Sequence, residues 1–189
     1  MASDLAPGLL AAAPTLLDPD FHESVVLVTN HTAEGSLGFV INRLMGLDLD
    51  EVAKELELFD DDRPLPDIQV LSGGPVAPET GWLIYDPREL IVEDQDSTLK
   101  VSEYLHITTS REVFGVALSQ PDLQRCLLVL GYSGWGEGQL DQEMKQGSWI
   151  GTDLGESIVF ETALENRWDE TIGTLGINPM QLIQFSGFN

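Results

Sequence analysis

Short apolar runs, bounded by turn-forming residues, recur along the chain and constrain its fold more than any other feature. Runs of this length with many β-branched residues are typical of strands, whereas helices need about ten residues or more. The continuous apolar segments 25–28 and 127–130 indicate strands that are buried on both faces. We therefore expect strands at residues 9–13, 24–30, 37–42, 67–73, 81–86, 105–109, 126–132 and 157–162.

Four segments between these runs have helical periodicity, at residues 48–58, 109–120, 139–146 and 166–176. Asp48 and Glu51 have the spacing of a capping box, and Thr109 and Glu112 have the same spacing in the second segment. Strands and helices do not alternate strictly, so a doubly wound parallel sheet is not indicated. We expect one α+β domain, spanning residues 1–189, with a single mixed and curved sheet.

Charge is the most extreme property of the composition. The 189 residues contain 32 Asp and Glu against 9 Lys and Arg, which gives a net charge of −23, and the cations are scattered singly. Repulsion of phosphate makes direct binding to nucleic acid or to an anionic membrane surface unfavourable. No run of 18 apolar residues is present, so we expect no membrane span.

The acidity has two interpretations that the sequence leaves open. One is a highly soluble cytoplasmic protein, for example from a salt-adapted organism, and the other is a docking surface for a basic partner. We expect a cytoplasmic location in either case. The single cysteine, Cys126, lies in an apolar run and is expected to be a buried hydrophobic residue.

Complete catalytic and cofactor-binding motifs are missing. Ser133 lies in Gly-Tyr-Ser-Gly-Trp, but a nucleophile elbow needs glycine where Trp135 stands. Residues 134–138 lack the glycine spacing of a dinucleotide site, and the turn at Gly73-Gly74 lacks the lysine of a P-loop. The three histidines do not have a recognised metal-ligand spacing. We therefore expect no catalytic residue, no cofactor and no metal.

A small-ligand site at the ends of the expected strands is the alternative. If residues 24–30 and 37–42 form a hairpin, Asn42 and Arg43 return to its open end near His22, where the arginine could hold a carboxylate or phosphate. Glycine turns could add backbone amides. The candidate ligand-binding residues are His31, Asn42, Arg43, Gly73, Gly74, Ser133, Trp135 and Gln139. Structural roles are the competing interpretation: tight turns for the glycines, a salt bridge for the arginine and core packing for the tryptophan.

Three separated motifs occur in one order along the chain: P-x-L-x-D-P-x-F-x-x-S-V at 14–25 followed by Asn42-Arg43, G-G-P-V at 73–76, and G-Y-x-G-W-x-x-G-Q-L at 131–140. Together they resemble the YqgE/AlgH family of bacterial proteins, over about residues 5–178. The chain departs from the family pattern at Leu44, where proline is common, at Ser133, where alanine is usual, and at Asp141, where glutamate is frequent. Alanine in place of Ser133 argues further against a catalytic serine.

The resemblance implies a compact α+β fold in which a branched sheet curls into a pseudo-barrel flanked by helices, in a cytosolic bacterial protein. It implies no reaction, because the family has no established biochemical function. Some members are described as transcriptional regulators of exopolysaccharide synthesis, but no helix-turn-helix is evident in this chain. We expect a non-enzymatic binding or regulatory module that acts through an unidentified protein or small ligand. The alternative is an enzyme or small-anion binder, and the oligomeric state stays open.

Overall fold

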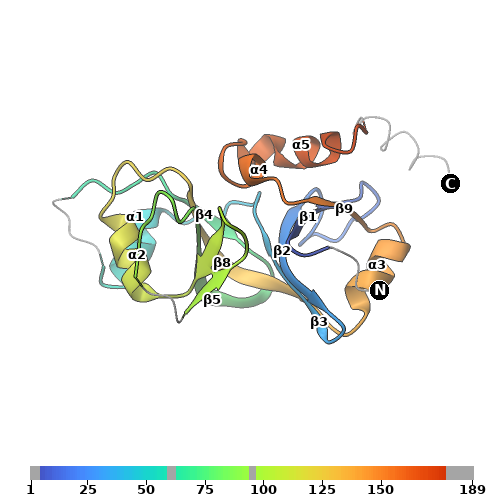
Figure 1. Ribbon diagram of the computed structural model, residues 1–189, viewed down its shortest axis with the longest axis horizontal. Coiled ribbons are helices and arrows are strands. Elements are labelled where there is room, and N and C mark those ends of the chain that lie inside the picture. The colour runs from blue at the N-terminus through green and yellow to red at the C-terminus, as the bar shows by residue number, and fades with distance from the viewer. Residues whose placement is uncertain (1–4, 59–62, 94–96, 178–189) are drawn as a thin grey trace.

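The computed structural model describes residues 5–58, 63–93 and 97–177. Its strands are β1 (Gly8–Ala12), β2 (Val25–Thr32), β3 (Gly35–Val40), β4 (Gln69–Ser72), β5 (Val76–Tyr85), β6 (Thr98–Lys100), β7 (His106–Thr108), β8 (Cys126–Trp135) and β9 (Trp149–Asp153). Its helices are α1 (Leu49–Glu55), α2 (Arg111–Leu118), α3 (Gln139–Lys145), α4 (Glu156–Phe160) and α5 (Arg167–Gly173), with a 3₁₀ turn, η1, at Leu164–Asn166. Figure 1 shows α4 and α5 along one side of the sheet, with α1 and α2 at one end and α3 at the other.

The strands form one branched sheet in the order β6-β7-β5-β8-β3-β2-β1-β9, and β4 adds to β8 outside this path. The pairing of β4 with β8 is parallel, and the other pairings described are antiparallel. The long strand β8 joins the part of the sheet that contains β4 and β5 to the part that contains β3. Its first half pairs with β4 and β5, and its last residues pair with β3. The α+β class and the mixed, curved sheet are therefore confirmed.

Central strands bury both faces, as their continuous apolar sequence predicts. Val25 and Leu27 of β2 belong to the same core cluster as Trp168 of α5. Val26 and Val28 point to the opposite side, into a cluster that includes Leu140 of α3. The sheet thus lies between two packed layers. A third cluster fills the space between α1, α2 and the strands β4, β5 and β8.

Helix α1 begins at the capping residue expected from the sequence, and helix α2 begins one residue later than expected. The capping box at the start of α1 is present, and the backbone N–H of Asp48 donates to Glu51 Oε2 over 2.9 Å. Helix α2 is capped by Ser110 rather than by Thr109, because the Ser110 hydroxyl accepts from the N–H of Val113 over 3.3 Å. The capping position expected from the sequence is therefore one residue too early.

Three elements differ from the sequence expectation. Residues 157–162 were expected to be a strand, but α4 occupies Glu156–Phe160 and buries Ile158 and Val159. A short apolar run has no period that separates a strand from a single buried helical turn. Strands β6 and β9 carry few continuous apolar residues, and their pairing partners decide their conformation.

Helix α5 is fastened to the sheet by two neighbouring side chains. The indole Nε1 of Trp168 donates to the carbonyl of Ala12 over 2.8 Å, and buried Arg167 donates to the carbonyls of Thr162 and Ile41. Burial lowers the pKa of Arg167 to about 10. The helix ends at Gly173, before the end of the segment 166–176 that has helical periodicity, and Leu175 is exposed.

Candidate functional site

The open end of the β2–β3 hairpin holds Asn42 and Arg43. The Asn42 side chain accepts from the N–H of Val25 over 2.8 Å and donates to the carbonyl of Glu23 over 2.9 Å. The guanidinium of Arg43 donates to three backbone carbonyls of the loop that precedes β2, at Pro19, Asp20 and His22, over 2.6–3.1 Å. The sequence correctly places both residues at the open end. Arg43 holds carbonyl groups there rather than the carboxylate that a salt bridge would supply.

The closed end of the same hairpin holds His31. Its Nδ1 lies 2.7 Å from the hydroxyl of Ser36, and its Nε2 lies 3.7 Å from a carboxylate oxygen of Asp141 on α3. His31 pairs with Ser36 across the two strands. At about 3.3 Å per residue, the seven residues that separate this position from the open end span roughly 20 Å. One small ligand therefore cannot contact both His31 and Arg43.

The turn at Gly73-Gly74 packs against β8. The hydroxyl of Ser133 is buried and donates to the carbonyl of Gly73 over 3.0 Å. The same carbonyl accepts from the N–H of Val40, and the N–H of Gly73 donates to Leu130. A Cβ on Gly74, which has a φ of +144°, would lie 2.4 Å from the Ser133 oxygen. Close approach of the backbone therefore accounts for the glycines, and the Ser133 hydroxyl is already engaged.

Trp135 and Gln139 meet at the carboxylate of Glu143, which is not among the residues proposed from the sequence. Glu143 accepts from the indole Nε1 of Trp135 over 3.0 Å and from the side-chain amide of Gln139 over 2.9 Å. It also accepts from the indole Nε1 of Trp149 over 2.8 Å. The i, i+4 spacing of Gln139 and Glu143 on α3 could have suggested this pair. The link to Trp149 depends on β9, which the sequence did not predict.

A small pocket adjoins this arrangement. We call it the aromatic pocket; its volume is about 320 Å³, and it is lined by Leu16, Asp18, Phe21, Pro75, Gly134, Trp135, Gln139, Glu143, Ser148 and Trp149. Two of the eight candidate ligand-binding residues, Trp135 and Gln139, line it. His31, Asn42, Arg43, Gly73, Gly74 and Ser133 do not.

A wider groove of about 720 Å³ lies between α1, α2 and β5, and we call it the α1–α2 groove. Its apolar lining is Met45, Leu47, Val52, Leu56, Pro78, Leu83, Phe114, Leu128 and Leu130, and its charged lining is Glu51, Glu55, Glu79 and Arg111. The volume falls within the range of about 300–1,000 Å³ that is usual for ligand pockets. None of the eight candidate residues lines this groove, and its walls come from segments far apart in the sequence.

The rim of the α1–α2 groove combines exposed apolar and acidic groups. Met45 is 37% exposed and Leu47 is 43% exposed. Among the described residues that line the groove, Arg111 is the one cation, and it donates to the carbonyl of Leu56. The positive charge of Arg111 therefore lies at the rim, and the hydrogen bond to Leu56 positions its guanidinium.

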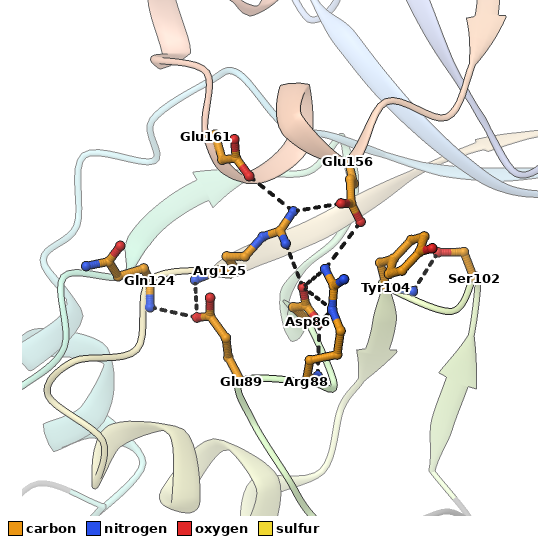
Figure 2. A network of polar contacts seen from close by, with 9 residues as sticks. All are labelled: Asp86, Arg88, Glu89, Ser102, Tyr104, Gln124, Arg125, Glu156 and Glu161. Atoms are coloured by element: carbon orange, nitrogen blue, oxygen red, sulfur yellow. Dashed lines mark hydrogen bonds and ion pairs between the residues drawn. The ribbon is translucent and has the colours of Figure 1, made fainter.

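An ion-pair network joins α4 to the ends of β5 and β8 (Figure 2). The buried carboxylate of Asp86 contacts Arg88 at 2.6 Å and Arg125 at 3.0 Å. Arg125 also reaches Glu156 and Glu161, both at 3.3 Å. Burial alone raises the pKa of Asp86, but hydrogen bonds from Arg88 and the two guanidinium charges outweigh it and hold that pKa below its usual value. The network ties three elements together.

Chemistry at these sites is limited by the groups present. Within the described ranges, no three His, Cys, Asp or Glu side chains are grouped so that they could hold a metal ion. Ser36, His31 and Asp141 place a hydroxyl, an imidazole and a carboxylate in a row, but neither Ser36 nor His31 lines the groove or the aromatic pocket.

Cys126 is buried as expected, and burial raises the pKa of its thiol. Over the same ranges, no helix combines the length and the apolar character needed to cross a bilayer.

Comparison with known proteins agrees with this architecture. A UPF0301 protein of Xanthomonas euvesicatoria is 37% identical over 99% of this chain and 97% of its own length, and a UPF0301 protein of Xanthomonas campestris is 36% identical over the same shares. The solution structure of AlgH from Pseudomonas aeruginosa superposes with a TM-score of 0.74 at 31% identity, covering 96% of this chain and 94% of AlgH. A Corynebacterium diphtheriae protein, DIP2367, has the same fold at a TM-score of 0.71 and 19% identity, over 96% of this chain and 91% of its own.

The family assignment rests on a match that covers most of the sequence. The sequence model of the family described as AlgH-like (DUF179) matches residues 9–180. The predicted resemblance to the YqgE/AlgH proteins is thereby confirmed, and this chain belongs to the AlgH-like family.

Proposed function

We propose that the protein is a non-catalytic binding module whose docking site is the α1–α2 groove. The occupant that we propose is a segment of a partner protein with apolar side chains flanked by lysine or arginine. The proposal places the protein in the cytoplasm, as the family resemblance implies. It makes any regulatory effect a consequence of contact with this partner and not of contact with DNA.

The observation that carries this proposal is an apolar groove that lies open beside exposed apolar side chains. Leu83, Leu128 and Phe114 line it, and all three are buried side chains of the core between the sheet and the two helices. Met45 and Leu47 extend the apolar surface outward. Covering such a surface removes apolar area from water at a gain of about 25 cal/mol per Å². Contiguous exposed apolar surface rimmed by polar groups is typical of interaction sites.

Charge selects among the possible occupants. Glu51, Glu55 and Glu79 line the groove, and the whole chain carries a net charge of −23. Arg111 is the one cation among the described lining residues, so the carboxylates outnumber it. Electrostatic complementarity mainly raises the association rate and excludes wrong partners, which here are acidic proteins and nucleic acids.

Binding of defined peptides tests the proposal. The probes are a peptide with a leucine-rich core between lysines and a peptide with the same core between glutamates, titrated into ¹⁵N-labelled protein. We expect the lysine-flanked peptide to shift amide signals of α1, α2 and residues 76–81, with an affinity that falls as salt rises. Equal binding of both peptides, or shifts confined to other surfaces, would contradict the proposal.

A matched pair of variants locates the site. Leu47→Lys places a positive charge at the groove and removes apolar surface, so we expect affinity for the lysine-flanked peptide to fall at least about tenfold. Ile91 is 80% exposed and does not line the groove, so Ile91→Lys makes the same chemical change elsewhere. We expect Ile91→Lys to leave the affinity within about twofold. Equal losses in the two variants would show that only net charge matters.

A further inference from the structure

The aromatic pocket lies at the other end of the molecule, beside α3, and is independent of the α1–α2 groove. Three aromatic rings from separate segments line it: Phe21 from the loop after β1, Trp135 from the end of β8 and Trp149 from the start of β9. The ring centroids lie 6.4 Å apart for Phe21 and Trp135, 5.5 Å for Phe21 and Trp149, and 5.9 Å for Trp135 and Trp149. The rings therefore form one compact group.

Hydrogen bonds fix this group in place. Glu143 accepts the indole N–H of both Trp135 and Trp149, and the amide of Gln139 holds its second carboxylate oxygen. Gln139 is in turn held by the backbone N–H of Gly136 over 3.0 Å. Gly138, the N-cap of α3, precedes Gln139 with a φ of +65°, which L-residues with a side chain rarely adopt. The pocket wall is thus preorganised before any ligand arrives.

The charge of this wall is not balanced from within. All three hydrogen-bond donors to Glu143 are neutral groups, and in the described part of the chain no Lys, Arg or His forms an ion pair with its half-buried carboxylate. Asp18 adds a second carboxylate to the lining. Arg43 binds carbonyls of the same loop, but it does not line the pocket. A half-buried negative charge next to aromatic rings is the complement of a cation.

The lining also decides which cation fits. A metal ion such as Mg²⁺ or Ca²⁺ needs six or more oxygen ligands, whereas much of this wall is aromatic or apolar. An alkylated ammonium group carries its charge on methyl groups and gains from aromatic contact without needing oxygen ligands. The volume of about 320 Å³ suits such a head group rather than a large molecule.

We infer that the aromatic pocket binds an organic cation with a methylated ammonium group, held by Phe21, Trp135 and Trp149 and by the charges of Glu143 and Asp18. The group can belong to a free small molecule of the choline type or to a trimethylated lysine of a protein. The chemistry of recognition is the same for both sources, and the test separates them.

The first test compares two ligands of one shape. Choline and 3,3-dimethyl-1-butanol differ in charge but have nearly the same shape, and the readout is the indole N–H signals of the ¹⁵N-labelled protein. We expect choline to shift the signals of Trp135 and Trp149 with a dissociation constant of about 1 mM, and to leave Trp82 and Trp168 unchanged. The neutral alcohol should bind at least about tenfold more weakly. Equal shifts with both compounds, or none with choline, would overturn the inference.

Variants then test the two carboxylates. Glu143→Gln should weaken choline binding about tenfold, and Asp18→Asn about threefold. Asp18 is exposed, so Asp18→Asn keeps the test decisive if Glu143→Gln disturbs the fold. Asp122→Asn removes an exposed carboxylate that does not line the pocket, and it should leave binding unchanged. Equal effects of Asp18→Asn and Asp122→Asn would count against a local site.

The second test identifies the source of the cation. A peptide with trimethyllysine is compared with the same peptide carrying unmodified lysine and with choline. Tighter binding of the trimethylated peptide than of choline supports a protein source, and similar binding of the two supports a small molecule. If neither binds more tightly than the unmodified peptide, the methylated ammonium group is not the ligand.

Discussion

The indole Nε1 of Trp168 donates a hydrogen bond of 2.8 Å to the carbonyl of Ala12, which is 156 residues earlier in the chain. Both groups are buried, and the bond fixes α5 on the first strand of the sheet. A contact with this sequence separation can form only when the sheet is assembled, so it reports on the complete fold.

Trp168→Phe should lower the free energy of unfolding by about 2 kcal/mol, because it removes the donor and leaves the Ala12 carbonyl buried without it. In a chain of this size, that loss lowers the melting temperature by about 4–8 °C. Trp82→Phe is the matched control, since the indole N–H of Trp82 is buried without a hydrogen-bond partner in the described residues. Urea unfolding of both variants measures the difference, and equal losses would show that packing alone matters.

Arg43→Met should destabilise the loop before β2 by about 1–3 kcal/mol, because the guanidinium holds the carbonyls of Pro19, Asp20 and His22. Amide hydrogen exchange should accelerate in residues 18–23. Lys145→Met removes one exposed cation that makes no side-chain hydrogen bond with the described residues, and it should change little. If phosphate slowed amide exchange of this loop in the wild-type protein but not in Arg43→Met, the anion-binding alternative would be supported instead.

Gly74→Ala should cost more than about 3 kcal/mol or prevent folding, because its Cβ would lie 2.4 Å from the Ser133 oxygen and 2.5 Å from the Tyr132 backbone. Gly46 also has a positive φ, of +78°, but a Cβ there would meet nothing within 4 Å. Gly46→Ala should therefore cost only about 1 kcal/mol. Thermal unfolding of the two variants separates the close approach of the backbone from the unfavourable φ.

Asp86→Asn should destabilise the protein by about 2–4 kcal/mol at pH 7, because Arg125 loses the negative charge of the buried carboxylate that it contacts. The pKa of Asp86 is lowered in the folded state, so its stabilisation is present above the unfolded value near 3.8 and is lost as the pH falls further towards the folded pKa. The difference in stability between wild type and Asp86→Asn should shrink in that acid range. The control Asp67→Asn changes an exposed carboxylate, and a constant difference across the pH range would contradict the prediction.

The sequence predicted the elements whose signals are local. The apolar runs at 24–30 and 126–132 became β2 and β8, and the capping box at Asp48 begins α1. The prediction of a strand at 157–162 was wrong. Two adjacent buried apolar residues, Ile158 and Val159, occur equally well in a strand and in a short helix, so the sequence does not distinguish the two. The hairpin geometry that brings Asn42 to Glu23 was also predictable, since it depends only on the pairing of adjacent strands.

The candidate site was predicted less well than the fold. Of the eight residues proposed from the sequence, Trp135 and Gln139 line the aromatic pocket, and ligand binding by any of the eight stays a prediction. The walls of the α1–α2 groove come from residues between Met45 and Leu130, and no motif spans such a distance. Glu143 was overlooked because one carboxylate among 32 has no distinguishing mark in the sequence.

By itself, the sequence determined the family, the strong negative charge and the strands buried on both faces, because these depend on residue identity and on local periodicity. Only the tertiary structure decided which side chains share a site. It separated His31 from Arg43 along one hairpin, and it gathered Phe21, Trp135 and Trp149 around Glu143. The reason is physical: which elements pack together is set by pairing and packing between distant segments, and a residue's spacing along the chain does not record that arrangement.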